Sequence, residues 1–420
     1  MRLRVGPWGA ARPAEKHGAA RPAEQDGAAR PAEKDDAARP VVADASETEA
    51  PEPAAPPPDD TPSQYPCPNC GAILGYQPGA HVLTCAFCGT VTEIAQGDAQ
   101  AQAEAVREQD FAAALRDGAA HAAMEVTQTV RCDACGAQVD FDPNQHAAVC
   151  PFCATPLVAD PAPDRHIRPQ ALLPFAIPER EAQARIRRWL SGLWFAPNGL
   201  KKFARTNASL GGVYTPYWTF DARTETAYSG QRGDTYFVTV RGADGKPSQV
   251  ARIRWRPASG RVRRGFDDVL VLGATSLPKA DTDALAPWDL HALQPYARDY
   301  LAGFRAESYT VPLQDGYAEA RRLMDDQIRR DVRAAIGGDQ QRIARLDTRI
   351  SDVTFKHVLL PVWIGAYKYG GKSWRVVING RTGAVRGARP YSWLKIAGAA
   401  LAGIALAALA LWLLQQGNMR

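Results

Sequence analysis

The chain has 420 residues, of which 45% are hydrophobic, and a formal net charge of +5. This length is enough for two or three folded units, and the composition is ordinary for a globular protein. A net charge this small does not by itself predict nucleic-acid binding. Arg2 and Arg4 open the chain, but no apolar segment follows them, so we expect no secretory signal.

The N-terminal 63 residues have the composition of a disordered tail. A nine-residue repeat, ARPAEKHGA and its variants, begins at Ala11, Ala20 and Ala29, and a segment rich in Pro, Glu and Asp follows it. Such a sequence buries too little apolar surface to offset the entropy that is lost on ordering. We expect residues 1–63 to be a solvated spacer; the alternative is a tail that binds a partner.

All eight cysteines belong to two copies of one CxxC…CxxC motif. The copies are Cys67, Cys70, Cys85 and Cys88, then Cys132, Cys135, Cys150 and Cys153. Four thiolates form a closed tetrahedral shell for structural Zn²⁺, with no open position for catalysis. We predict two small β zinc ribbons, residues 64–95 and 130–160, that bind two zinc ions per chain in a reducing cytosol. His81 and His146 are equivalent in the two copies, and we expect them to pack rather than to bind metal.

A linker and a larger domain follow from the next patterns. Residues 96–129 contain no proline and are rich in Ala, Glu and Gln, which predicts a helical linker. Residues 165–392 predict an α+β domain, with helices over 178–194 and 315–336. Its expected strands cover residues 213–222, 235–240, 250–256, 262–272, 358–368 and 374–378.

The C-terminal residues form an apolar segment. Residues 396–414 are only Ile, Ala, Gly, Leu and Trp. As a helix they would span about 28 Å, close to the roughly 30 Å hydrocarbon core of a bilayer. Arg386, Arg389 and Lys395 precede the segment, and this basic flank favours a cytoplasmic location for the bulk of the chain. We predict a single-pass, tail-anchoring transmembrane helix over 395–415; the alternative is a buried, alanine-rich core helix.

Motifs of enzymes are missing from the sequence, which contains no HExxH, GxSxG or GxGxxG. Residues 366–373, AYKYGGKS, end like a phosphate-binding loop. Ala366 replaces the first glycine of that loop, however, and the flanks predict two strands around a turn at Gly370 and Gly371. We therefore expect that the protein is not an enzyme.

Arginine alternates with apolar residues in the α+β domain. A four-residue hairpin loop at 257–260 would place five arginines on one sheet face: Arg252, Arg254, Arg256, Arg261 and Arg263. This arrangement predicts a binding site for phosphate, an acidic protein segment or anionic lipid. The alternative, which we favour, is a solvated face or a set of internal ion pairs, for instance with Asp267 and Asp268.

Several segments resemble one protein family. They are CPNCGA at 67–72, CDACGA at 132–137, CPFCATPLV at 150–158, GVYTPYWTFDA at 212–222 and KHVLLPVWIGAYKYGGKSWRVVINGRTGAVRGARPYSW at 356–393. Over residues 64–415 the chain resembles bacterial membrane-anchored double zinc-ribbon proteins, which are often labelled TFIIB-type zinc ribbon proteins or mislabelled primosomal protein N′-like helicases. The resemblance implies a non-enzymatic protein of the inner membrane, linked to flotillin-like (SPFH) or phage-shock-type systems of envelope stress.

These observations together predict a multidomain protein with two zinc ribbons, an α+β domain and a transmembrane helix. We expect a tail-anchored membrane adaptor that recruits a protein partner. The alternative is a membrane-tethered nucleic-acid-binding protein of replication or transcription. Arg131 is the only Lys or Arg within either ribbon, which disfavours nucleic-acid contact by the ribbons.

Overall fold

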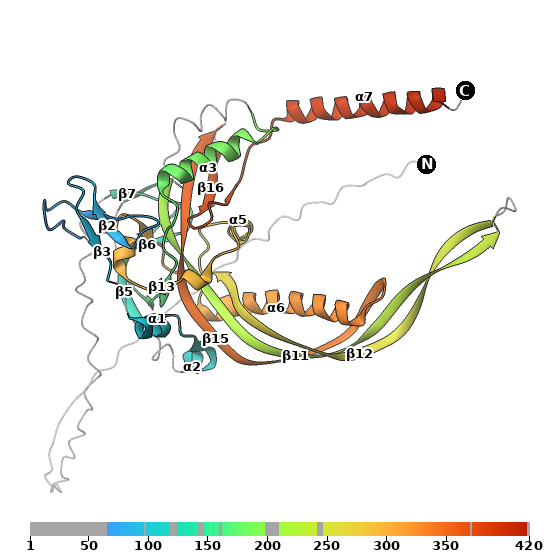
Figure 1. The fold of residues 1–420 in the computed structure, drawn as a ribbon, viewed down its shortest axis with the longest axis horizontal. Coiled ribbons are helices and arrows are strands. Elements are labelled where there is room, and N and C mark those ends of the chain that lie inside the picture. Colours follow the sequence, from blue (N-terminus) through green and yellow to red (C-terminus); the bar gives the residue numbers. More distant parts are fainter. Residues whose placement is uncertain are drawn as a thin grey trace, which may run out of the picture. The chain divides into compact units, whose positions relative to one another are not determined.

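A computed structural model describes residues 65–95, 98–116, 124–140, 147–153, 155–158, 162–197, 210–241, 247–369 and 372–417. All described residues belong to one compact unit, Pro57–Arg420. The predicted tail therefore lies outside the described residues, as do His146 and the turn at Gly370 and Gly371. The described part is mostly β, with some helices, two cysteine tetrads and an apolar C-terminal helix (Figure 1).

Small antiparallel sheets carry the cysteines. In ribbon 1, the described residues 65–95, three strands pair in sequence order: β1 (Leu74–Tyr76), β2 (Val82–Cys85) and β3 (Val91–Glu93). Ribbon 2, the described residues of 124–167, has a three-stranded sheet of β5 (Met124–Arg131), β6 (Gln138–Asp140) and β9 (Ala162–Ile167), and a pair of β7 (Ala147–Val149) and β8 (Pro156–Val158).

The segment between the ribbons is not one helix. Its described elements are α1 (Ala99–Ala105), β4 (Gln109–Asp110) and α2 (Phe111–Arg116), and β5 begins at Met124. The interruption has a tertiary cause, because β4 pairs with Thr354 and Phe355 of the large sheet. Phe111, the first residue of α2, is buried and its ring lies 4.4 Å from the ring of Tyr317, so packing against the body fixes this segment next to β4.

A nine-stranded sheet forms the body of the protein. Its strands are β10 (Ala171–Leu172), β11 (Leu210–Arg241), β12 (Pro247–Leu272), β13 (Gln294–Pro295), β14 (Arg305–Ala306), β15 (Gln340–Tyr369), β16 (Lys372–Asn379) and β17 (Val385–Gly387), with β4 as the ninth. The main order is β12-β11-β15-β10-β13. Three strands are unusually long, since β11, β12 and β15 contain 32, 26 and 30 residues.

The predicted hairpin loop at 257–260 is wrong, and so is the division of β11 and β12 into shorter strands. β12 pairs with β11 without a register shift from Pro247 to Phe266, and Pro257 lies opposite Gln231. Pro257 has no backbone N–H group to donate. Because β12 is an edge strand, the missing donor is one that would face solvent and not a neighbouring strand. The turn-like residues of 257–260 therefore remain within one strand.

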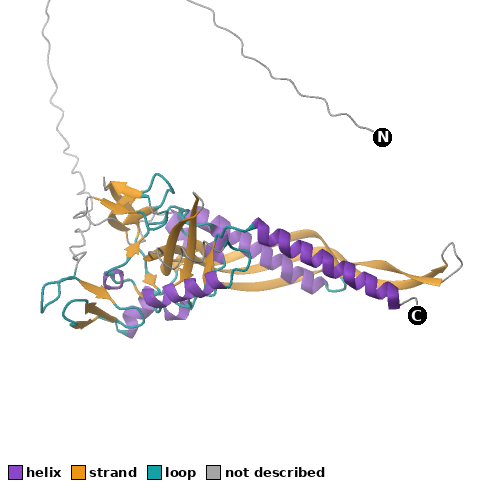
Figure 2. Ribbon diagram, turned by 90° about the horizontal axis from the view of Figure 1, so that it is seen from above, coloured by secondary structure: helices purple, strands orange, loops and turns teal. Residues whose placement is uncertain are grey.

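Two predicted helices are confirmed. α3 (Glu179–Ser191) and α6 (Leu313–Ile336) begin and end within three residues of their expected limits, and the C-terminal end of α6 matches its limit. Gly337, with φ of 68°, ends α6 because only glycine adopts this conformation freely. α6 runs along the long strands (Figures 1 and 2), and its Ile328, Val332 and Ile336 are buried against them. The shorter helices are α5 (Lys279–Asp283), η1 (Leu290–Ala292) and η2 (Arg298–Leu301).

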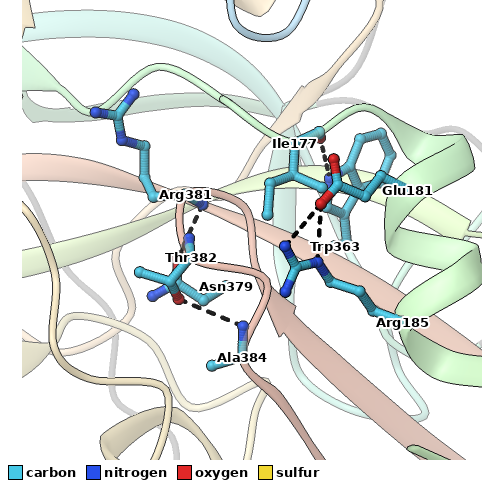
Figure 3. A network of polar contacts seen from close by, with 8 residues as sticks. All are labelled: Ile177, Glu181, Arg185, Trp363, Asn379, Arg381, Thr382 and Ala384. Carbon is cyan, nitrogen blue, oxygen red and sulfur yellow. Dashed lines mark hydrogen bonds and ion pairs between the residues drawn. The ribbon is translucent and has the colours of Figure 1, made fainter. Parts of the chain in front are cut away.

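The turn between β16 and β17 is held by a buried side chain. The Asn379 side-chain oxygen accepts hydrogen bonds from the backbone N–H groups of Arg381 (2.8 Å) and Thr382 (2.9 Å), as Figure 3 shows. Nearby, Trp363 of β15 donates its indole N–H to the carbonyl of Ile177 at 2.8 Å. This last bond connects the segment just before α3 to the sheet.

β15 and β16 form a hairpin in which Tyr369 pairs with Lys372. The segment that resembles a phosphate-binding loop thus lies on two antiparallel strands, as the sequence predicted. A phosphate loop needs a strand, a glycine-rich loop and a helix in succession. Residues 372–379 continue as strand, so this lysine does not open a helix.

The C-terminal helix α7 (Trp393–Gly417) matches the predicted apolar segment. Its window Trp393–Trp412 has a mean hydropathy of 2.1, and none of it is buried by the described chain. α7 is therefore not a core helix of this fold. By length and composition it is able to cross a membrane.

Candidate metal centres

Tight turns place the cysteines of ribbon 1. Cys67 and Cys70 precede β1, while Cys85 ends β2 and Cys88 follows it. In each turn a glycine at positive φ succeeds the cysteine pair, Gly71 at 75° and Gly89 at 73°. Their N–H groups donate to the carbonyls of Cys67 (2.9 Å) and Cys85 (3.0 Å), and this closes both turns.

The thiol groups of ribbon 1 have the spacing of a tetrahedral metal shell. The Cys67 and Cys88 sulfurs lie 3.5 Å apart, as do those of Cys70 and Cys85, and all four lie within 4.8 Å of one another. Zinc–sulfur bonds of about 2.3 Å imply sulfur–sulfur distances of about 3.8 Å in a tetrahedron. The four sulfurs therefore fit one zinc ion after a small adjustment.

Ribbon 2 repeats this geometry. Its sulfur pairs, Cys132 with Cys153 and Cys135 with Cys150, lie 3.5 and 3.6 Å apart, and the set again falls within 4.8 Å. Gly136 has φ of 74°, as its counterpart in ribbon 1 does. None of the eight cysteines forms a disulfide. The structure thus brings together both tetrads that the repeated spacing predicted.

Two threonines complete the sites, and the sequence interpretation missed them. The Thr90 hydroxyl lies 3.1 Å from the Cys88 sulfur, and the Thr155 hydroxyl lies 3.2 Å from Cys153. Thr90 lowers the pKa of the Cys88 thiol to about 5. Burial raises the pKa of Cys153, but the bonds to Thr155 outweigh it and bring that pKa to about 7. Each threonine follows its cysteine by two residues, so the internal repeat was the signal that could have revealed them.

Ribbon 1 shares a hydrophobic core with the body. Cys67 and Cys85 are buried in one cluster with Phe175 and Tyr76. The Tyr76 hydroxyl donates to the Phe175 carbonyl at 3.1 Å. His81 Nδ1 lies 2.8 Å from the Tyr300 hydroxyl, so this histidine packs against the body, as predicted. The metal-binding turns are therefore fixed to the body.

Ribbon 2 contacts the body through buried acidic residues. Glu125 forms an ion pair with Arg298, and the Ser308 hydroxyl lies 3.2 Å from Asp140. Glu307 is only 2% exposed, and neither of its carboxylate oxygens has a hydrogen-bond partner among the described residues. Burial raises the pKa of Glu307 to about 8; the nearby Ser276 hydroxyl opposes this rise, and the charge of Asp140 adds to it. The carboxyl group is therefore mostly protonated at neutral pH.

We expect the Glu307→Gln variant to become more stable than the parent protein as pH rises from 6 to 8. The folded pKa of about 8 exceeds the unfolded pKa of about 4.3, so only the folded state holds the proton in this window. The parent loses stability as pH rises, whereas the neutral amide does not. The difference in unfolding free energy should grow by roughly 1 kcal/mol per pH unit. Urea unfolding of the zinc-loaded chain measures it, with exposed Glu179→Gln as control; parallel curves would contradict the assignment.

The five arginines predicted to share one face are divided between two. Side chains alternate along the continuous β12, so Arg261 and Arg263 lie on the face opposite to the other three. Arg263 and Arg261 both pair with Glu225, at 3.1 and 3.5 Å. Arg263 is the main reason why the pKa of Glu225 is lowered. One carboxylate therefore offsets part of the charge of this half, although it belongs to a different acid from those expected.

The other half has no such partner. Arg252, Arg254 and Arg256 lie on the same face of β12 as Ala258 and Val262, which pack against α6, and within the described residues no carboxylate pairs with them. The Arg254 guanidinium lies over the Tyr236 ring at 4.9 Å. The expected partner Asp268 instead pairs with Lys356 at 2.9 Å. These three arginines remain available to an external anion.

An acidic group that the sequence did not reveal lies near α2. Glu108, Asp221 and Asp267 place one carboxylate oxygen each within 4.8 Å of one another. Lys356, which is buried, lies 3.4 Å from Glu108. A cation of the chain itself thus offsets part of this charge, and we assign the group a structural role.

Comparison with known proteins identifies a relative of this chain. No family model matches the chain. The chain is 25% identical over 341 residues to the uncharacterized protein YdjG of Bacillus subtilis (strain 168). The match covers 79% of this chain and 92% of that protein. The similarity extends over nearly all of a relative whose name states no function.

Proposed function

We propose that this protein is a non-enzymatic, tail-anchored membrane adaptor. Two zinc ions hold the cysteine turns rigid, and α7 anchors the chain in a bacterial inner membrane with the ribbons in the cytoplasm. The support is the closed four-thiolate geometry of both sites, the exposed apolar helix and the basic residues that precede it.

One difference between the ribbons supports the proposed adaptor role. Phe87 and Phe152 are equivalent in the repeat, yet Phe152 is fully buried against the body and Phe87 is 84% exposed. A large aromatic side chain on a rigid turn is the kind of anchor that dominates protein–protein interfaces. We propose that Phe87 of ribbon 1 inserts into a protein partner. The family resemblance favours a flotillin-like or phage-shock-type protein of envelope stress as that partner.

A pull-down from detergent-solubilised membranes, followed by mass spectrometry, tests this function. The parent chain should recover a membrane-associated protein that the Phe87→Ala variant loses, because truncation of an interface anchor typically costs 2 kcal/mol or more. Val126→Ala is the matched control, since Val126 is 60% exposed but lies on ribbon 2. Equal recovery by both variants would contradict the role of Phe87.

A further inference from the structure

The far end of the long sheet is a two-stranded segment. β15 begins at Gln340, which pairs with Gly233, so beyond this point only β11 and β12 remain. We name this segment the arm tip and define it as residues 234–241 and 247–254. Figure 1 shows that it extends past the C-terminal end of α6. All residues of 247–254 are exposed, so the described chain does not cover this segment.

Apolar side chains lie on both faces of the arm tip. Phe237, opposite Ala251, and Ile253 share one face and are 66% and 36% exposed. Val250, opposite Val238, lies on the other face and is 42% exposed. A flat protein surface would cover only one of these faces. The interfacial region of a bilayer surrounds an inserted hairpin and therefore covers both faces. Water in this region can form hydrogen bonds with the unpaired backbone groups at the strand edges.

The charges next to the arm tip are complementary to an anionic surface. Arg252, Arg254 and Arg256 have no carboxylate partner within the described residues, and they immediately adjoin the apolar side chains. Basic residues that flank exposed apolar ones are typical of segments that lie in the interface of anionic membranes. In the same chain, α7 is able to place the protein at a bilayer.

We propose that the arm tip is a second membrane contact, which binds the anionic leaflet of the bilayer in which α7 is anchored. Phe237, Val250 and Ile253 enter the boundary between headgroups and acyl chains, and the three unpaired arginines bind lipid phosphates. This inference rests on the proposed anchoring by α7. Each arginine should strengthen the contact about fivefold, and the loss of two should weaken it roughly 25-fold.

Hydrogen exchange of the full chain in nanodiscs tests the proposal. One set of discs contains only phosphatidylcholine, and the other contains a quarter of phosphatidylglycerol. We expect exchange in residues 234–241 and 247–254 to slow at least tenfold in the anionic discs relative to the neutral ones. The Arg252→Gln/Arg254→Gln variant should lose this protection. The Arg261→Gln/Arg263→Gln variant removes the same charge from the same strand and should keep it, because those arginines are paired with Glu225.

The outcomes separate this proposal from the others. Insertion of the chain into the discs depends on α7 and is measured separately. The zinc content verifies that each variant is folded. A chain that enters the discs but exchanges equally in both lipids overturns the contact while leaving the anchor intact. If protection appears in detergent and increases with protein concentration, the arm tip binds a second copy of the chain. If single-stranded DNA protects the arm tip and anionic lipid does not, the arm tip binds nucleic acid. Either result overturns the proposal.

Discussion

Replacing Cys85 with Ser should lower the zinc content from two ions per chain to one. Cys85 is 2% exposed and supplies one of the four sulfurs of ribbon 1, whereas the ribbon 2 site shares none of its ligands. Metal loss is among the changes that cost more than about 4 kcal/mol of stability. Although ribbon 1 packs against the body, its roughly 30 residues bury too little core of their own to keep the cysteine turns folded without the metal. We therefore expect ribbon 1 to unfold while ribbon 2 stays metallated.

Elemental analysis of the purified protein in reducing buffer measures this ratio, and thermal unfolding measures the loss of stability. Ala86→Ser is the control, because Ala86 is the exposed neighbour of Cys85 and receives the same side chain. The parent and the control should both contain close to two zinc ions. A parent that is folded without zinc, or a Cys85→Ser variant that retains two ions, would refute the assignment of these ligands.

Truncation after Ser392 should move the protein from the membrane fraction to the soluble fraction. This change removes all of α7, whose apolar window is not buried by the described chain, so the body loses no core residue. Membrane insertion of such a helix is effectively irreversible, whereas surface contacts are not. We expect nearly complete release when membranes are washed with high salt, because salt also weakens the contact proposed for the arm tip.

A chain that lacks only residues 418–420 is the matched control and should remain in the membrane. Protease added outside spheroplasts tests the orientation, since the basic residues before α7 favour a cytoplasmic body. The ribbons should resist this protease and be degraded only after lysis. Degradation from the outside would reverse the proposed topology, and a truncated chain that stays in salt-washed membranes would refute the anchor.

Local sequence patterns were sufficient to predict the two cysteine tetrads and two helices. A CxxC turn with a following glycine, as at Cys67–Gly71, is determined by a few adjacent residues, and its exact repetition leaves little ambiguity. The apolar stripe of α6 and the glycine at its end are equally local. The same holds for the uncharged segment that becomes α7.

Long-range pairing determined what the sequence alone could not show. Residues 257–260 have the composition of a turn, yet their register with β11 keeps them in one strand, and this divides the five arginines between two faces. Phe87 and Phe152 are identical in type and equivalent in motif. Only the packing of ribbon 2 against the body buries one and leaves the other exposed.

The sequence by itself determined the two cysteine tetrads, the helices α3 and α6, and the apolar C-terminus, because each depends on spacing within one short segment. The tertiary structure alone decided how far the strands run, which arginines find a carboxylate and which aromatic residue remains uncovered. These properties depend on side chains that lie far apart in the chain, such as Arg263 and Glu225, and their pairing becomes visible only when the strands are aligned.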